Sequence, residues 1–344
     1  MTQTRSSLRR IQTDKVEETD SMHIDVDLIA AVIPFLTAFA VSAVSGKFLI
    51  PFLRRLKAGQ TERDDGPESH LKKTGTPNMG GLMILLGVTA GCILPFRGSG
   101  QTIPVLILTI GFGLIGFADD YIKVVKKRSD GLYAWQKMLL QIALAICFSI
   151  YVQKVHSIPL SMKIPFMPGR VLDLGILNTA ALIFIAVATV NGTNFTDGVD
   201  GLASCVTIAV AVFFVIAAAA AASGVVMAGT AMIGALLGFL LYNAYPAKVF
   251  MGDTGSLALG GFVTGMAYML QLPLFIPIVG FIYFIEVVSV IIQVAWFKKT
   301  GGKRFFRMAP IHHHFELGGW SEVRVVAVFT IITAVLGAAA LLAL

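Results

Sequence analysis

Charged residues are scarce in this chain: they make up 14% of its 344 residues, whereas 56% are hydrophobic. A soluble domain carries about 25% charged residues, which help to cover its surface. Several apolar runs also approach the ~20 residues that cross a bilayer as a helix. The composition therefore excludes an ordinary soluble protein and indicates an integral membrane protein.

Cysteine is nearly absent, and the polar first residues do not fit the pattern expected of a signal peptide. The three cysteines lie inside apolar segments, which excludes a disulfide framework and a zinc site. Residues 1–21 are polar and lack the apolar core of a signal peptide. We expect them to be a disordered extension or an expression remnant, followed by one transmembrane domain that covers residues 22–344.

The apolar runs predict an all-α, polytopic membrane protein with about ten transmembrane helices. The ninth contains Pro273 and Pro277, and proline removes a helix hydrogen bond, so we expect this helix to be bent or broken. The predicted spans are Val26–Leu53, Met79–Phe96, Ile103–Ala118, Ala134–Val152, Ile176–Val190, Leu202–Ala222, Val225–Tyr245, Ser256–Leu270, Leu272–Phe297 and Val323–Leu344.

The net charge of +7 has a topological explanation. Lysine and arginine concentrate in the first, third and last loops, so the positive-inside rule places the odd-numbered loops in the cytosol and both termini outside. Nucleic acid is therefore not needed as a partner. The loop from Gln153 to Gly175 is rich in proline, and we expect a short extracytoplasmic hairpin there.

In this orientation the unusual polar residues share the cytosolic side. Asp119 and Asp120 end the apolar run of the third span. Neighbouring residues on a helix point about 100° apart, so one carboxylate can face a site while the other contacts a neighbouring helix. A solvated helix end with nearby lysines is the alternative.

The segment NGTNFTDGVDG carries an amide or acid at every third position. In helical backbone these residues would share a face, and Gly198 would permit close approach of a ligand. A turn with capping residues is the alternative. The four residues are Asn191, Asn194, Asp197 and Asp200.

Two further segments offer groups suited to phosphate chemistry. Asp253 precedes the eighth span, and carboxylate oxygens are ligands that Mg²⁺ prefers, although Asp253 could also cap that helix. His312, His313 and His314 are consecutive, which suits zinc poorly, but imidazoles can bind phosphate oxygens. A basic loop near the membrane is the alternative reading of the histidines.

Together these residues form an inventory for phosphoryl transfer to a lipid acceptor. An ion-coupled transporter is an alternative from another class, but its carboxylates would lie near the middle of the membrane. No Ser or Cys is paired with a base as a nucleophile. We therefore expect direct attack by a lipid phosphate, with a two-step route through a phosphorylated aspartate as the rival.

Five motifs in order, from about Asp25 to the C-terminus, resemble the phospho-N-acetylmuramoyl-pentapeptide transferase family. They are TPNMGG, GFADDYIKV, NFTDGVDGLA, YNAYPAKVFMGDTGSLALGG and PIHHHFELGGW. The first departs from the family's usual TPTMGG at Asn78, which can still form hydrogen bonds and puts only threonine-specific contacts in doubt.

The resemblance implies a Mg²⁺-dependent enzyme of the bacterial inner membrane, surrounded by membrane lipids. It would transfer phospho-MurNAc-pentapeptide from UDP-MurNAc-pentapeptide to undecaprenyl phosphate, giving lipid I and UMP for peptidoglycan synthesis. A sister enzyme that transfers N-acetylglucosamine phosphate to the same lipid is the alternative. The oligomeric state stays open, with a homodimer among the alternatives.

The resemblance also implies roles for individual residues. Asp253 would bind the metal, Asp119 would act as the base or phosphate-activating group, and Asp120 and His312 would complete the catalytic set. Phe250 would stack on uracil. The expected substrate-binding residues are Lys72, Lys73, Lys137, Asn191, Asn194, Asp197, Gly198, Asp200, Asn243, Phe250, Gln293, His313 and His314.

Overall fold

A computed structural model describes residues 3–56, 75–94, 100–126 and 131–344, with side chains described from residue 29 and not at residues 125 and 126. Its regular structure is helical apart from one short hairpin, which confirms the predicted all-α class. The elements are α1 Gln3–Arg55, α3 Gly81–Ile93, α4 Thr102–Lys126, α5 Ala134–Val155, β1 Met162–Lys163, β2 Val171–Leu172, α6 Leu177–Thr196, α7 Leu202–Ala220, α8 Val226–Asn243, α9 Gly252–Met269, η1 Pro273–Phe275, α10 Ile276–Val279, α11 Phe281–Lys299, α12 Ile311–Glu316 and α13 Glu322–Leu341.

Each of the ten predicted spans overlaps helical structure in the described residues, although the last two residues of Met79–Phe96 lie outside them. Within the described residues, eight helices are long and apolar enough to cross a membrane. Of the other two, α3 has 13 residues, and α9 is less apolar. All of α9 except its first two residues is buried, so protein rather than lipid surrounds it. That enclosure explains how a helix rich in glycine and hydroxyl groups can lie among transmembrane helices.

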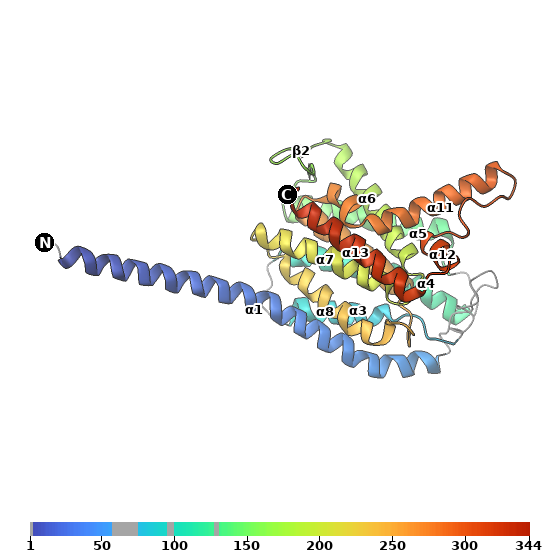
Figure 1. Cartoon of the computed structure of the whole chain (residues 1–344), viewed down its shortest axis with the longest axis horizontal. Helices are drawn as coiled ribbons and strands as arrows, with labels where there is room; N and C mark the ends of the chain where they lie inside the picture. Colours follow the sequence, from blue (N-terminus) through green and yellow to red (C-terminus); the bar gives the residue numbers. More distant parts are fainter. Residues whose placement is uncertain (1–2, 57–74, 95–99, 127–130) are drawn as a thin grey trace.

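The ninth span is broken, as its prolines predict. Its first part consists of η1 and α10. Pro273 is the first residue of η1, and Pro277 lies near the start of α10. Gly280 then leaves helical geometry, and α11 begins at Phe281. Beyond the break, α11 extends away from the main bundle (Figure 1).

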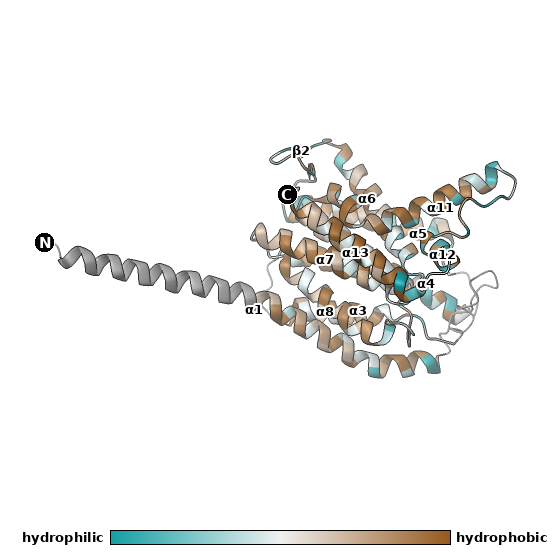
Figure 2. Ribbon diagram, viewed as in Figure 1, coloured by the Kyte–Doolittle hydropathy of each residue, from teal (hydrophilic) through white to brown (hydrophobic). Residues whose placement is uncertain are grey.

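The hairpin and the C-terminus lie at one end of the bundle, and α12 lies at the other (Figure 1). In the hairpin, β1 and β2 pair antiparallel with Met162 opposite Leu172, which confirms the hairpin predicted in this loop. Hydrophilic residues gather near α12 and at the tip of α11 (Figure 2). The last turns of α1 and α11 are both basic and point toward this end, in keeping with the predicted orientation.

The central helix α9 packs against α3, α4 and α6. Close approach depends on glycine: a Cβ at Gly261 would lie 2.6 Å from the carbonyl oxygen of Leu108, and one at Gly116 would collide with the backbone of Asp253. Small residues allow helix backbones to approach in this way. The contact sets the start of α9 against the last part of α4, where the aspartate pair lies.

Candidate active site

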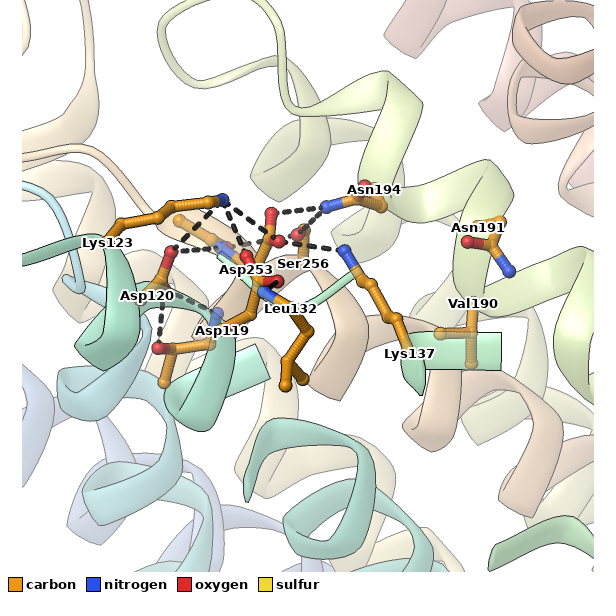
Figure 3. Close-up of polar contacts among 12 residues, drawn as sticks. Asp119, Asp120, Lys123, Leu132, Lys137, Val190, Asn191, Asn194, Asp253 and Ser256 are labelled. Atoms are coloured by element: carbon orange, nitrogen blue, oxygen red, sulfur yellow. Dashed lines mark hydrogen bonds and ion pairs between the residues drawn. The ribbon is translucent and has the colours of Figure 1, made fainter. Parts of the chain in front are cut away.

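Three aspartates from two helices form an acidic cluster at the end of the bundle that carries α12. Asp119 and Asp120 lie near the end of α4, and Asp253 lies in the first turn of α9. One carboxylate oxygen from each lies within 4.8 Å of the others (Figure 3). The packing of α9 on α4 therefore joins two sequence motifs that are more than a hundred residues apart.

Asp120 holds the N-terminus of α9. Its Oδ2 accepts hydrogen bonds from the backbone N–H of Thr254 at 2.9 Å and from the Thr254 hydroxyl at 2.7 Å. Its Oδ1 accepts from the Asp253 N–H and from Asn78 Nδ2, both at 3.3 Å. A carboxylate in this position satisfies N–H groups that have no partner within the helix and interacts favourably with the helix dipole. Asp120 thereby fixes the backbone that carries Asp253.

Asp119 points in a different direction from Asp120. It accepts a hydrogen bond from the Leu132 N–H at 2.8 Å, and its Oδ2 is 2.6 Å from Lys123 Nζ. A Cβ at Gly131 would lie 2.5 Å from the Asp119 carboxylate, so glycine allows the chain to pass this close. The two neighbouring carboxylates therefore have different partners, Lys123 and Leu132 for Asp119 and the start of α9 for Asp120.

Two lysines share the carboxylate of Asp253. Its Oδ2 is 2.7 Å from Lys137 Nζ and 3.3 Å from Lys123 Nζ (Figure 3). Burial acts to raise the pKa of Asp253, but the charges of Lys137 and Lys123 outweigh it and hold that pKa well below its ordinary value. From the sequence, Lys123 is expected only as a basic loop residue or as a partner of a solvated helix end. Its spacing of four from Asp119 on one helix was the available signal.

The end of α6 supplies one amide to the cluster. Asn194 Nδ2 donates to Asp253 Oδ1 at 2.9 Å and to Ser256 Oγ at 2.8 Å. Asn191 instead donates to Gln141 Oε1 at 2.8 Å and lies apart from the carboxylates (Figure 3). Asn191 and Asn194 therefore contact different partners although they are three residues apart.

The prediction that four polar residues of this segment share one helical face is wrong. α6 ends at Thr196, and the backbone at Asp197 is no longer helical. Burial, followed by the charges of Asp253 and Asp120, raises the pKa of Asp197 well above its ordinary value. The charges of Asp253 and Asp120 therefore act on Asp197, which lies just beyond the end of α6.

Asp200 and Asn243 tie two loops together. Asp200 Oδ2 accepts from the Ala247 N–H at 2.9 Å. Asn243 Oδ1 accepts from the Gly201 N–H at 3.1 Å, and its Nδ2 donates to the Val249 carbonyl at 3.0 Å. These bonds join the loop after α6 to the loop before α9.

Phe250 lies in the loop that leads into α9, and its backbone pairs with the TPNMGG segment. Its N–H donates to the Pro77 carbonyl at 2.8 Å, and its carbonyl accepts from the Gly80 N–H at 2.8 Å. Its side chain is partly exposed. The two predicted lysine contacts at Lys72 and Lys73 lie outside the described residues.

The three histidines point to three different partners, as consecutive helical residues must. The fully buried His312 has Nδ1 at 3.1 Å from Glu286 Oε1. His313 Nδ1 is 2.7 Å from Glu316 Oε2, within α12. His314 Nδ1 accepts from the Arg307 N–H at 3.1 Å and thereby closes the loop before α12.

Gln293 supports the same loop from α11. Its Oε1 accepts from the N–H groups of Phe305 at 3.1 Å and Phe306 at 2.9 Å. Glu286, seven residues earlier on α11, was not selected from the sequence as a site residue. An acid inside an apolar span was its signal.

The cluster fits a hard divalent cation. Its donors are carboxylate oxygens, which Mg²⁺ and similar ions prefer, and Asp119 and Asp253 offer them toward each other. Asp120 is less available because Thr254, Asp253 and Asn78 already donate to it. The adjacent ammonium groups of Lys123 and Lys137 could bind phosphate oxygens. This set can hold a metal and a diphosphate together.

Comparison with known proteins agrees with this chemistry. The family model described as glycosyl transferase family 4 matches residues 102–271. Three similar proteins all carry the name phospho-N-acetylmuramoyl-pentapeptide-transferase. One from Acetivibrio thermocellus is 48% identical over 92% of this chain and 96% of its own. One from Clostridioides difficile is 50% identical over 88% and 94%, and one from Clostridium botulinum is 50% identical over 88% and 92%.

Proposed function

The chain belongs to the phospho-N-acetylmuramoyl-pentapeptide-transferase family, and from this premise we propose that it synthesises lipid I. It transfers phospho-MurNAc-pentapeptide from UDP-MurNAc-pentapeptide to undecaprenyl phosphate and releases UMP. The observation that carries the proposal is the identity of 48–50% to relatives of this name over about nine-tenths of the chain. The same observation favours it over transfer of N-acetylglucosamine phosphate.

The protein is a multi-pass bacterial membrane protein with its acidic cluster at one end of the bundle. We propose that this end faces the cytosol, where the UDP-linked donor is found, and that both termini lie outside. The basic last turns of α1 and α11 support this orientation. The position of the cluster near helix ends also argues against an ion relay at the middle of the membrane.

Mg²⁺ is the proposed cofactor, and Asp253, with Asp119 beside it, is its proposed ligand. The support is the close approach of their carboxylate oxygens at the start of α9. The bound ion would neutralise charge on the diphosphate of the donor. Asp120 keeps Asp253 in place through its bonds to the start of α9.

The two lysines are proposed to bind the phosphates. Lys137 and Lys123 have their ammonium groups at 2.7 and 3.3 Å from Asp253, so phosphate oxygens bound beside Asp253 would lie within their reach. Asp119 would orient the lipid phosphate, which is mostly ionised at neutral pH because its second pKa is about 6. It would also take up any proton that remains.

Direct attack is the proposed route. An oxygen of the lipid phosphate forms a bond to the β-phosphorus of the donor, the bond from that phosphorus to the bridging oxygen breaks, and UMP leaves with this oxygen. Ser256, the hydroxyl next to the cluster, is bonded to Asn194 and to the Gly252 carbonyl rather than to a base. It is therefore poorly placed to act as a nucleophile.

The remaining predicted contacts divide into two groups. We propose that Asn194, Asp197, Gly198, Phe250 and His313 line the nucleotide and sugar site, with Phe250 stacked on uracil. The second group is proposed to shape that site through loop contacts. It consists of Asn191, Asp200, Asn243, Gln293 and His314.

A direct assay tests the proposal. Purified protein is incubated with undecaprenyl phosphate and either UDP-MurNAc-pentapeptide or UDP-N-acetylglucosamine, with and without Mg²⁺. We expect UMP and lipid I only with the muramoyl donor and Mg²⁺. UMP from the N-acetylglucosamine donor alone would establish the sister activity instead. A phosphosugar covalently bound to protein after incubation with donor alone would replace direct attack by the two-step route.

A further inference from the structure

Glu286 and His312 form a buried pair beside the loop that follows α6. Neither side chain is exposed, and Glu286 Oε1 lies 3.1 Å from His312 Nδ1. The two atoms are close enough to pair, although their angles fall short of a straight hydrogen bond. No other residue in the described part of the chain forms a hydrogen bond with either side chain. Each is therefore the main polar partner of the other.

A carboxylate in this position carries a large desolvation penalty. Glu286 lies on α11 one turn after Tyr283, a residue of the hydrophobic core. A buried acid without a partner is strongly unfavourable, and ionisable residues inside apolar spans usually serve a functional site. Packing alone therefore does not account for glutamate at this position.

The opposite side of the His312 ring faces the loop that contains Asp197 and Gly198. A Cβ at Gly198 would lie 2.6 Å from His312 Cε1 and nearer still to Nε2, so glycine leaves the space that the ring edge occupies. Burial and the charges of Asp253 and Asp120 raise the pKa of Asp197, the residue before Gly198. The imidazole thus connects Glu286 in the core to a loop beside the acidic cluster.

We propose that Glu286 is a positioning residue for His312. Its carboxylate accepts the Nδ1–H of His312, which fixes the ring and its tautomer and directs Nε2 toward the phosphate-bearing substrate beside Gly198. The hydrogen bond at one imidazole nitrogen decides the state of the other, and such supporting carboxylates orient functional histidines. His313 has its ring centroid 4.0 Å from that of His312, and Asp197 precedes Gly198 in the loop that the ring contacts. This inference rests on the proposed function.

Kinetics on the full chain in lipid nanodiscs test the proposal. Glu286→Gln keeps the volume and removes the charge, and we expect it to lower kcat about 10- to 100-fold with little change in KM for the UDP-linked donor. Because Glu286 acts through His312, a double variant with His312→Gln should be no slower than His312→Gln alone. Additive losses, or a normal kcat for Glu286→Gln, would overturn the proposal.

Tyr283→Phe provides a matched control. Tyr283 is buried on the same helix and has a hydroxyl contact of 2.7 Å with Thr207, outside the proposed site. Its loss should lower stability but leave kcat near that of the parent protein. An equal fall in kcat for Tyr283→Phe and Glu286→Gln would indicate a purely structural role for Glu286.

A second measurement needs neither turnover nor a folded Glu286→Gln protein. Nitrogen-15 NMR of the parent protein with labelled histidine should show His312 with its hydrogen on Nδ1, and the signal is assigned by its absence from His312→Gln. A neutral ring with hydrogen only on Nε2 would refute the pairing, including when Glu286→Gln fails to fold. Absence of UMP release by the parent protein would instead reject the proposed function and leave the NMR result standing.

Discussion

Replacement of Asp120 by asparagine tests whether this residue stabilises the structure of the site or takes part in the reaction. The Asp120 carboxylate accepts four hydrogen bonds, two from Thr254, one from the Asp253 N–H and one from Asn78. Asparagine has the same shape but presents an NH₂ group in place of one oxygen. Whichever way the amide turns, a donor then faces either Thr254 or the pair of Asp253 and Asn78.

The expected loss of stability follows from these contacts. A hydrogen bond to a charged group contributes about 1.5–3 kcal/mol, and a carboxylate at a helix N-terminus adds about 0.3–2 kcal/mol. Because the remaining oxygen still accepts part of the set, we expect Asp120→Asn to destabilise the protein by about 2–4 kcal/mol. The start of α9 should loosen, and Asp253 should move with it.

Thermal unfolding in detergent and UMP release together test this prediction. Asp120→Asn should lower both the melting temperature and the activity. Thr254→Val serves as the control because it removes only the 2.7 Å hydroxyl contact, and it should destabilise by about 1 kcal/mol. An inactive Asp120→Asn protein with the parent melting temperature would show that Asp120 takes part in the chemistry and that the capping argument is insufficient.

Three further substitutions test other parts of the site. Asp253→Asn should abolish Mg²⁺-dependent UMP release and weaken Mg²⁺ binding in titration calorimetry without unfolding the protein; near-normal turnover would reject Asp253 as the metal ligand. Phe250→Ala should weaken binding of the UDP-linked donor by about 1–3 kcal/mol if the ring stacks on the base, and unchanged affinity would show that it only packs. Asp197 has a raised pKa, so its stabilising contribution is present while it is protonated and is lost as pH rises through that pKa. Asp197→Asn should therefore raise the melting temperature of the metal-free protein at pH 8 relative to the parent. The melting temperature of the variant should also change less with pH. An equal change with pH in both proteins would contradict the raised pKa of Asp197.

Features governed by local chemistry could be predicted from the sequence. The apolar runs located the helices because each must satisfy its own backbone hydrogen bonds in lipid. Pro273 and Pro277 located the break in the ninth span, since proline acts on the helix that contains it. The divergence of Asp119 and Asp120 follows from helix geometry alone.

Features governed by packing between distant segments could not be predicted. The three-residue spacing from Asn191 to Asp200 suggested one face, but it carries no information on where α6 ends, and the helix stops at Thr196. Asp120 finds its partners more than a hundred residues away at the start of α9. Glu286 meets His312 across the packing of α11 against α12, which are separated by a loop.

The charge balance of the acidic cluster connects its architecture to its function. Helix packing holds Asp119, Asp120 and Asp253 close together. Burial and mutual repulsion disfavour the charged form of these three carboxylates. Lys123 and Lys137 offset part of that repulsion through contacts of 2.6–3.3 Å. Three carboxylates against two ammonium groups leave an excess of negative charge, to which Asp197 adds when it ionises. A divalent cation would offset this excess and release the lysines to bind phosphate, so the charge balance of the cluster favours the ligands that the proposed reaction requires.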